Sequence, residues 1–209
     1  MKKKSLMLFA AALFGLVSLA QAQEASIAVY LDEAGTTCNG QTASGIINGS
    51  VWVNLDGAAA GGITGAEFRV DPTLGYNGEF FNGYTASVTS DAPIIFGNPF
   101  NEGGTNVTFT SCQTASRVRL MTFQLIDMTE RSDVWLNVRQ HAFPPNYTFQ
   151  CALLTLCDDP VFTKVCVGGT GSDIHWYSIV NPTNGAASDC APVSVAEKTW
   201  SEIKSLYRN

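Results

Sequence analysis

The stretch Ser50-Val51-Trp52-Val53-Asn54-Leu55 decides the fold, because its apolar side chains recur at every second position. Successive side chains of a β-strand point to opposite sides, so Trp52 and Asn54 share one face and the apolar residues share the other. Alternation of this kind predicts a half-buried strand. The apolar face of the expected strand consists of Val51, Val53 and Leu55.

The alternation recurs in Asp133–Ala142, where Trp135 and Asn137 again lie opposite an apolar face. In a third run it slips between Leu120 and Met121. A slip of one residue predicts a β-bulge that redirects the strand.

Short β-prone runs are spaced along the whole chain and are separated by Asn-Gly, Gly-Gly, Asp-Pro, Pro-Pro and Asn-Pro steps, which form turns and loops. The expected strands are Ser26–Leu31, Ser50–Leu55, Ala66–Val70, Tyr84–Ser90, Asn106–Cys112, Arg117–Leu125, Asp133–Ala142, Asn146–Cys151 and Ile174–Val180. About nine strands with this spacing predict an all-β fold, a single sandwich or jelly roll.

The segment Val51–Val70 has a strand, a Gly-rich turn and the run Gly-Ile-Thr-Gly-Ala-Glu-Phe-Arg-Val, followed by Asp71-Pro72. It resembles the opening strands of cohesin-type modules, which are jelly-roll sandwiches akin to some carbohydrate-binding modules and which dock protein partners. The resemblance implies a partner-binding sandwich. Cohesins generally lack six cysteines, and no docking residue carries over. The whole chain, including Cys151–Val167, also resembles uncharacterised secreted bacterial proteins.

The N-terminus has the pattern of a secretory signal peptide over residues 1–22. Lys2, Lys3 and Lys4 precede an apolar run from Leu6 to Leu19, and Ala20-Gln21-Ala22 offers a cleavage site. The apolar run is shorter than the ~20 residues that a spanning helix needs. We therefore expect a chain that is secreted, periplasmic or at the cell surface, with no membrane span after cleavage.

We expect residues 23–192 to form one β-sandwich domain and residues 193–209 to form a tail with a short amphipathic helix. Thr199-Trp200-Ser201-Glu202 matches a capping box, and Trp200, Ile203 and Leu206 then share one helix face. Either this helix packs on its own domain, or it serves attachment.

The charge of the chain argues against two kinds of anionic partner. The leader holds three of the 12 Lys and Arg residues and none of the 18 Asp and Glu residues. The remaining chain is strongly acidic, which argues against nucleic acid or an anionic membrane surface.

All six cysteines follow the leader, and an even number in an oxidising compartment predicts disulfide bonds. Leu153–Cys157 and Phe162–Val167 flank Asp158-Asp159-Pro160, so they predict a hairpin that pairs Cys157 with Cys166. The pattern argues for no pairing among the other four cysteines, and Cys38 with Cys112 and Cys151 with Cys190 are guesses from those that remain.

The sequence carries none of the common signatures of catalysis. The chain has no Gly-x-Ser-x-Gly, no His-Glu-x-x-His, no P-loop and no dinucleotide fingerprint. Ser172, Asp173 and His175 lie too close in sequence for a hydrolase triad. Asp158-Asp159 and Asp32-Glu33 lack calcium-loop spacing. We expect no enzyme, no cofactor and no metal site, with a hydrolase as the least favoured function.

The candidate ligand-binding residues are Trp52, Asn54, Trp135 and Asn137. An indole beside an amide on an exposed sheet face suits a sugar, because the ring covers a pyranose and the amide bonds its hydroxyls. The same pattern is typical of a sheet face that a loop or the tail covers, and this structural interpretation ranks first because tryptophan is more often buried. This hypothesis requires both indoles to lie partly exposed on the same sheet. The sequence therefore predicts a module that binds a glycan or an extracellular protein. The alternative is a structural subunit of an extracellular assembly that associates with itself.

Overall fold

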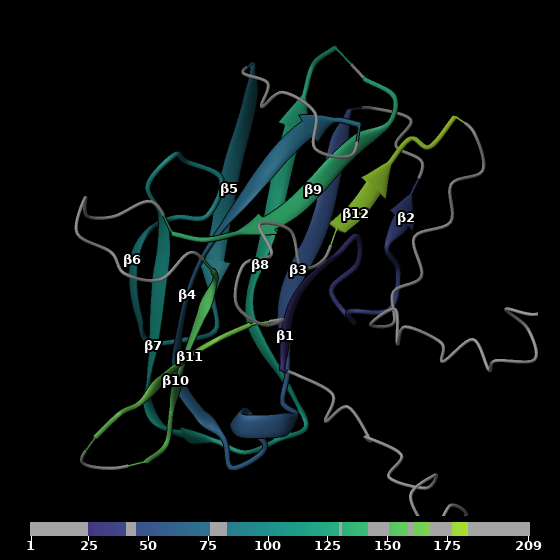
Figure 1. Cartoon of the computed structure of the whole chain (residues 1–209). Coiled ribbons are helices and arrows are strands. Elements are labelled where there is room, and N and C mark those ends of the chain that lie inside the picture. Colours follow the sequence, from purple (N-terminus) through teal and green to yellow (C-terminus); the bar gives the residue numbers. More distant parts are fainter. Residues whose placement is uncertain are drawn as a thin grey trace, which may run out of the picture.

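The computed structural model describes residues 25–40, 45–75, 83–129, 131–141, 151–158, 161–167 and 177–183. Apart from one 3₁₀ turn, Gly57–Ala59, the regular structure of these residues is β (Figure 1). The strands are β1 (Ser26–Tyr30), β2 (Asn39–Gly40), β3 (Ile46–Asn54), β4 (Ile63–Leu74), β5 (Tyr84–Ser90), β6 (Ile94–Asn98), β7 (Gly104–Gln113), β8 (Arg117–Asp127), β9 (Val134–Arg139), β10 (Leu153–Leu156), β11 (Lys164–Cys166) and β12 (Tyr177–Val180).

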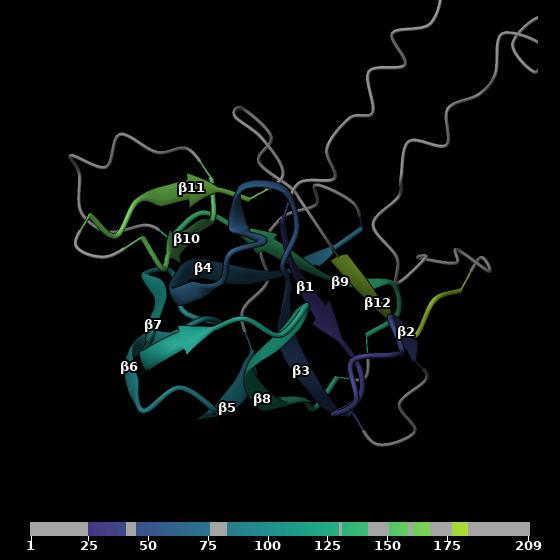
Figure 2. The same cartoon turned by 90° about the horizontal axis from the view of Figure 1, so that it is seen from below.

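The strands form the two layers of a β-sandwich, which are seen edge-on in Figure 2. One sheet has the order β1-β3-β8-β5, and the other has the order β11-β10-β4-β9-β12-β2. β7 pairs with β4, and β6 pairs with β7 at the edge of the second sheet. The long β4 organises that sheet, because its first half pairs with β10 and β7 and its second half pairs with β9. The predicted all-β sandwich is confirmed.

The core lies between the layers and is built from the alternating apolar positions. Val51 and Val53 of β3 have no exposed surface, whereas Trp52 and Asn54 on the opposite face are partly exposed. Other fully buried side chains come from both sheets, among them Phe68, Leu120, Leu125, Leu136 and Leu154. Alternation thus predicted correctly which face of β3 packs inward.

The predicted bulge in β8 is confirmed. Val51 pairs with Met121 and Trp52 pairs with Arg119, so Leu120 is the extra residue of β8. Leu120 and Met121 are both fully buried. A regular strand would turn one of these consecutive apolar side chains outward, and the bulge lets both pack in the core.

Two strands of the second sheet, β2 and β6, were not predicted. β6 contains Gly97 and Asn98, residue types that indicate turns. In the structure, Ile95 of β6 pairs with Val107 of β7, and the Ile95 side chain packs against the core. Tertiary pairing therefore overrides the local turn preference at this position.

The predicted cysteine pairing is wrong. Cys112 is bonded to Cys157, and Cys151 is bonded to Cys166, each with a Cα–Cα distance of 5.6 Å. Cys38 is also disulfide-bonded, so Cys112 is not its partner. The suggested pairing of Cys151 with Cys190 fails for the same reason.

The predicted hairpin exists, but its two strands pair in a register that places Cys166 opposite Leu153 instead of Cys157. The Asp158 carboxylate accepts a hydrogen bond from the Thr163 backbone N–H at 2.7 Å, which closes the turn tightly. Leu156 N–H then donates to the Thr163 carbonyl, and Cys166 pairs with Leu153. Cys157 is left beyond the ladder and free to bond elsewhere, which explains the wrong pairing.

Several predictions fall on residues outside the described ranges. These are the signal peptide of residues 1–22, the C-terminal helix within 193–209, the strand Asn146–Cys151 up to its last residue, and Cys190. Within the described ranges, no helix has the length and hydropathy needed to cross a membrane.

Candidate functional site

Trp52 lies on the outer face of the four-stranded sheet, in a small apolar cluster separate from the main core. The cluster also contains Ala28, Tyr30 and Cys38. The indole Nε1 of Trp52 donates to Ser50 Oγ at 2.9 Å. Gly35, with φ of +69°, brings the chain so close that an added Cβ would lie 2.5 Å from that nitrogen. The connection after β1 therefore packs on Trp52 and leaves the indole only partly exposed.

Arg117, at the start of β8, lies over the same two aromatic rings. Its guanidinium carbon is 4.8 Å from the centre of the Trp52 ring and 5.2 Å from that of Tyr30. Arg117 Nε donates to Asn54 Oδ1 at 3.2 Å, and Nη2 donates to the Gly35 carbonyl at 2.7 Å. The predicted pair of Trp52 and Asn54 therefore holds an arginine in place.

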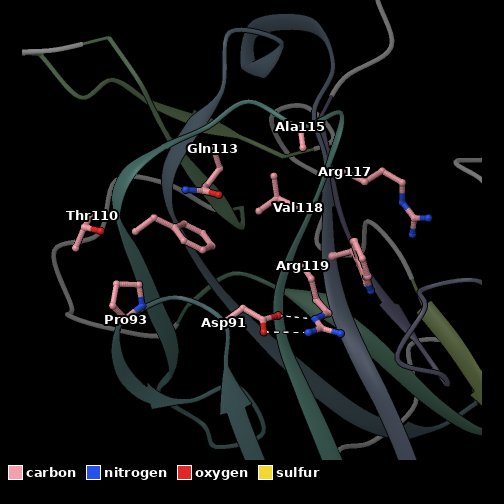
Figure 3. Close-up of a pocket in the computed structure, with 10 residues that line it drawn as sticks. Asp91, Pro93, Thr110, Gln113, Ala115, Arg117, Val118 and Arg119 are labelled. Atoms are coloured by element: carbon pink, nitrogen blue, oxygen red, sulfur yellow. Dashed lines mark hydrogen bonds and ion pairs between the residues drawn. The ribbon is translucent and has the colours of Figure 1, made fainter.

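A pocket of about 550 Å³ lies beside this group, where the chain passes from one sheet to the other. Figure 3 shows Arg119 turned toward Asp91, and the two side chains form a bidentate ion pair with N–O distances of 2.5 and 3.1 Å. β7 bulges opposite Gly65, and the extra residues bring Phe109 to the pocket wall. Bulges border the pocket in both sheets, as they often do at binding sites.

A second pocket of about 340 Å³ follows on the outer face of the same sheet. We call its row of uncharged polar side chains the hydroxyl–amide face, which consists of Asn48 of β3, Ser87 and Thr89 of β5, and Thr122 and Gln124 of β8. Gln124 Nε2 donates to Asn48 Oδ1 at 3.0 Å. This bond uses one group of each amide, so the Asn48 NH₂ and the Gln124 carbonyl can still bond a ligand.

Three acidic residues lie near Arg117 and Arg119. Asp91 is paired with Arg119, Glu33 lines the second pocket and acts electrostatically on Arg119, and Asp32 is held within its own loop. Burial opposes ionisation of Asp32, but hydrogen bonds from the Thr36 side chain and from the Thr37 and Thr36 N–H groups outweigh it and lower the pKa of Asp32, with a further contribution from Arg117. The Asp32 carboxylate therefore stays ionised and is held by its own loop.

The other predicted pair lies elsewhere, which is a correction. Trp135 and Asn137 belong to β9, in the second sheet, whereas Trp52 and Asn54 belong to the first. Asn137 is completely buried and donates to Thr73 Oγ1 at 2.7 Å. The two tryptophans are both partly exposed, but they do not form one surface.

The residues that sequence reasoning missed are Arg117, Arg119 and Asp91. The only sequence signal for these residues was the predicted bulge at Leu120, because a bulge changes which side chains of β8 lie on the same face as Trp52. In the part of the chain that the structure describes, no three His, Cys, Asp or Glu residues cluster to hold a metal ion. Ser172, Asp173 and His175 lie outside that part.

Together, the fold and this surface define a disulfide-bearing β-sandwich module with an open polar sheet face. Among solved structures, the chain is similar to the cohesin module from Clostridium perfringens ATCC13124 family 33 glycoside hydrolase. The two are 10% identical, with a TM-score of 0.43, over 77% of this chain and 98% of that module. No protein-family model and no curated protein sequence matches the chain.

Proposed function

We propose that this chain is a secreted, non-catalytic module that binds a glycan on the outer face of its four-stranded sheet. The observation that carries the proposal is the hydroxyl–amide face, which is exposed and next to the pocket at Trp52. Side-chain amides and hydroxyls are well suited to sugar hydroxyls, because each can both donate and accept hydrogen bonds.

Two further features support this reading. The face presents uncharged groups from three neighbouring strands, so an extended ligand could contact all of them at once. Disulfide bonds persist in oxidising compartments, which suits a protein that acts in the periplasm, at the cell surface or outside the cell. Trp52 and Asn54 take part by positioning Arg117 at one end of the site.

The test is retention of the purified protein on a panel of immobilised polysaccharides. Gln124→Ala should weaken binding about fivefold, since a lost hydrogen bond costs about 1 kcal/mol and 1.4 kcal/mol is tenfold. Gln140→Ala is the matched control, because Gln140 is exposed just after β9 in the other sheet. Failure to bind any polysaccharide, or equal losses in both variants, would contradict the proposal.

A second candidate function is self-association, and one observation favours it. Among the strands that the structure describes, β6 pairs with β7 alone, and it exposes Phe96 (69%) and Ile94 (41%) on the same side. Edge strands in soluble proteins usually carry charges that prevent pairing between copies. β6 has no charged side chain, so it could join two copies in an extracellular assembly.

A further inference from the structure

Arg117 differs from every other cation in the described part of the chain. Arg69 and Arg139 contact Asp71, Arg119 contacts Asp91, Arg131 contacts Asp127, and Lys164 contacts Glu67. Arg117 alone among these described Lys and Arg residues forms no ion pair with a carboxylate. The chain has 18 acidic against 12 basic residues, so a lack of available anions does not explain the exception.

The hydrogen bonds of Arg117 leave one side of its guanidinium open. Nε donates to Asn54 Oδ1, and Nη2 donates to the Gly35 carbonyl, so both acceptors are neutral. A guanidinium has five N–H groups. Three N–H groups therefore remain available, two on Nη1 and one on Nη2. Nη1 and Nη2 together form the fork that binds a carboxylate through two parallel hydrogen bonds.

The surroundings of Arg117 fix this fork before any ligand arrives. The Trp52 and Tyr30 rings support the guanidinium at 4.8 and 5.2 Å. A side chain that is already oriented loses less conformational entropy on binding. The neighbouring acids do not occupy it. Asp91 is paired with Arg119, Asp32 accepts hydrogen bonds from Thr36 and Thr37, and Glu33 acts on Arg119 from the second pocket.

We propose that Arg117 binds a carboxylate of the ligand, and that the glycan is therefore acidic, with uronic-acid residues. This inference rests on the proposed glycan-binding function. The side chains of the hydroxyl–amide face form hydrogen bonds with the sugar hydroxyls, and Arg117 binds the carboxylate at the end of the site. Arginine is suited to this role, because its planar fork matches a carboxylate in a way that the ammonium of lysine does not.

The experiment measures binding of the purified protein to polygalacturonate, alginate and hyaluronate, each beside its carboxyl-reduced form. The unreduced polymer of at least one pair should bind at least tenfold more tightly than the reduced one, and its binding should weaken as salt rises. Arg117→Gln should abolish this preference, so that the acidic and the reduced polymer of that pair bind with equal affinity. Arg117→Lys should keep the salt dependence but bind the acidic polymer several-fold more weakly than the unchanged protein.

The outcomes separate the inference from the function on which it rests. Equal binding of acidic and reduced polymers would overturn the role of Arg117 and leave the glycan-binding function intact. Binding of polyglutamate, with no polysaccharide retained, would overturn both, and it would indicate a protein partner instead. A melting temperature unchanged in Arg117→Gln excludes unfolding as the cause of lost binding. If Arg117→Gln unfolds, the role of Arg117 is tested by comparing the affinity of Arg117→Lys for the acidic polymer with that of the unchanged protein.

Discussion

Cys112 of β7 is disulfide-bonded to Cys157, which follows β10, so this bond joins the two strands that flank β4. The cysteines are 45 residues apart in sequence, against 15 for Cys151 and Cys166. A bridge that closes a longer loop restricts the unfolded chain more.

We expect replacement of Cys112 and Cys157 by Ser to lower the free energy of unfolding by about 4 kcal/mol. Replacement of Cys151 and Cys166 should cost about 3 kcal/mol. Urea titration of both double variants measures the difference. Peptide mapping of the unreduced protein should show both bridges. A peptide that links Cys157 to Cys166 would contradict this pairing.

Gly62 allows the Cys112–Cys157 bridge to pass close to the chain before β4. Its φ is +108°, and an added Cβ would lie 2.7 Å from Cys112 Sγ and 2.8 Å from the Gln113 carbonyl oxygen. Gly62→Ala should therefore destabilise the protein by about 1–3 kcal/mol, as overpacking does. Gly61→Ala is the control, since nothing lies within 4 Å of its added Cβ. Equal melting temperatures for the two variants would show that the close approach does not matter.

Asp127 should make the stability of the fold depend on acid pH. Burial opposes ionisation of Asp127, but hydrogen bonds from Thr129 and Arg131 outweigh it and hold its pKa below the ordinary 3.8. A carboxyl with a lowered pKa adds stability above its unfolded pKa, and this stability is lost as pH falls through the folded pKa. Asp127→Asn should thus be less stable than the unchanged protein at neutral pH, and this difference should shrink as the pH falls below 3.8 and through the lowered pKa of the folded state. Urea midpoints at several pH values test this, and a gap independent of pH would refute it.

Phe96 tests whether copies of the chain associate through β6. If they do, Phe96→Ser should shift the purified protein from dimer or polymer to monomer in sedimentation velocity. Met128→Ser is the control, because Met128 is 82% exposed but lies after β8 in the other sheet. A protein that is monomeric at every concentration before substitution would exclude this contact.

Substitution of Trp52 should weaken ligand binding, whereas substitution of Trp135 should not. Trp52→Ala removes the ring that supports Arg117, so it should weaken retention on the bound polysaccharide by about tenfold, the scale of an exposed cation–π contact and its hydrogen bonds. Trp135→Ala changes the other sheet and should leave retention unchanged. Fluorescence titration with the bound polysaccharide measures both, and a loss confined to Trp135→Ala would contradict the assignment of the site.

Much of the fold could be predicted because burial imposes a period of two on each strand. Tyr84–Ser90 was predicted with the bounds of β5, and the bulge at Leu120 followed from two consecutive apolar residues. Strand register could not be predicted, because it depends on turn contacts such as that between Asp158 and Thr163. The cysteine pairing failed for that reason.

The candidate site was predicted only in half. Trp52 and Asn54 were identified as neighbours on an outward face, and they are. Their grouping with Trp135 and Asn137 failed, because alternation within a strand does not reveal which sheet that strand joins. Arg117 was missed because its contacts come from Gly35, Asn54 and two aromatic rings that are distant in sequence.

The bulge at Leu120 has a consequence for how the binding surface could arise or be lost. Arg117 and Arg119 carry odd numbers, while Thr122 and Gln124 carry even numbers, yet all four pair with even-numbered residues of β3. In an unbroken strand, odd and even positions face opposite sides. Because of the single inserted residue, odd-numbered side chains before the bulge and even-numbered side chains after it lie on the same face of β8. Without the bulge, the two arginines and the Thr122–Gln124 pair would lie on opposite faces of the sheet. Deletion of that one codon would turn the arginines inward relative to the threonine and glutamine, although every residue of the site would still be encoded.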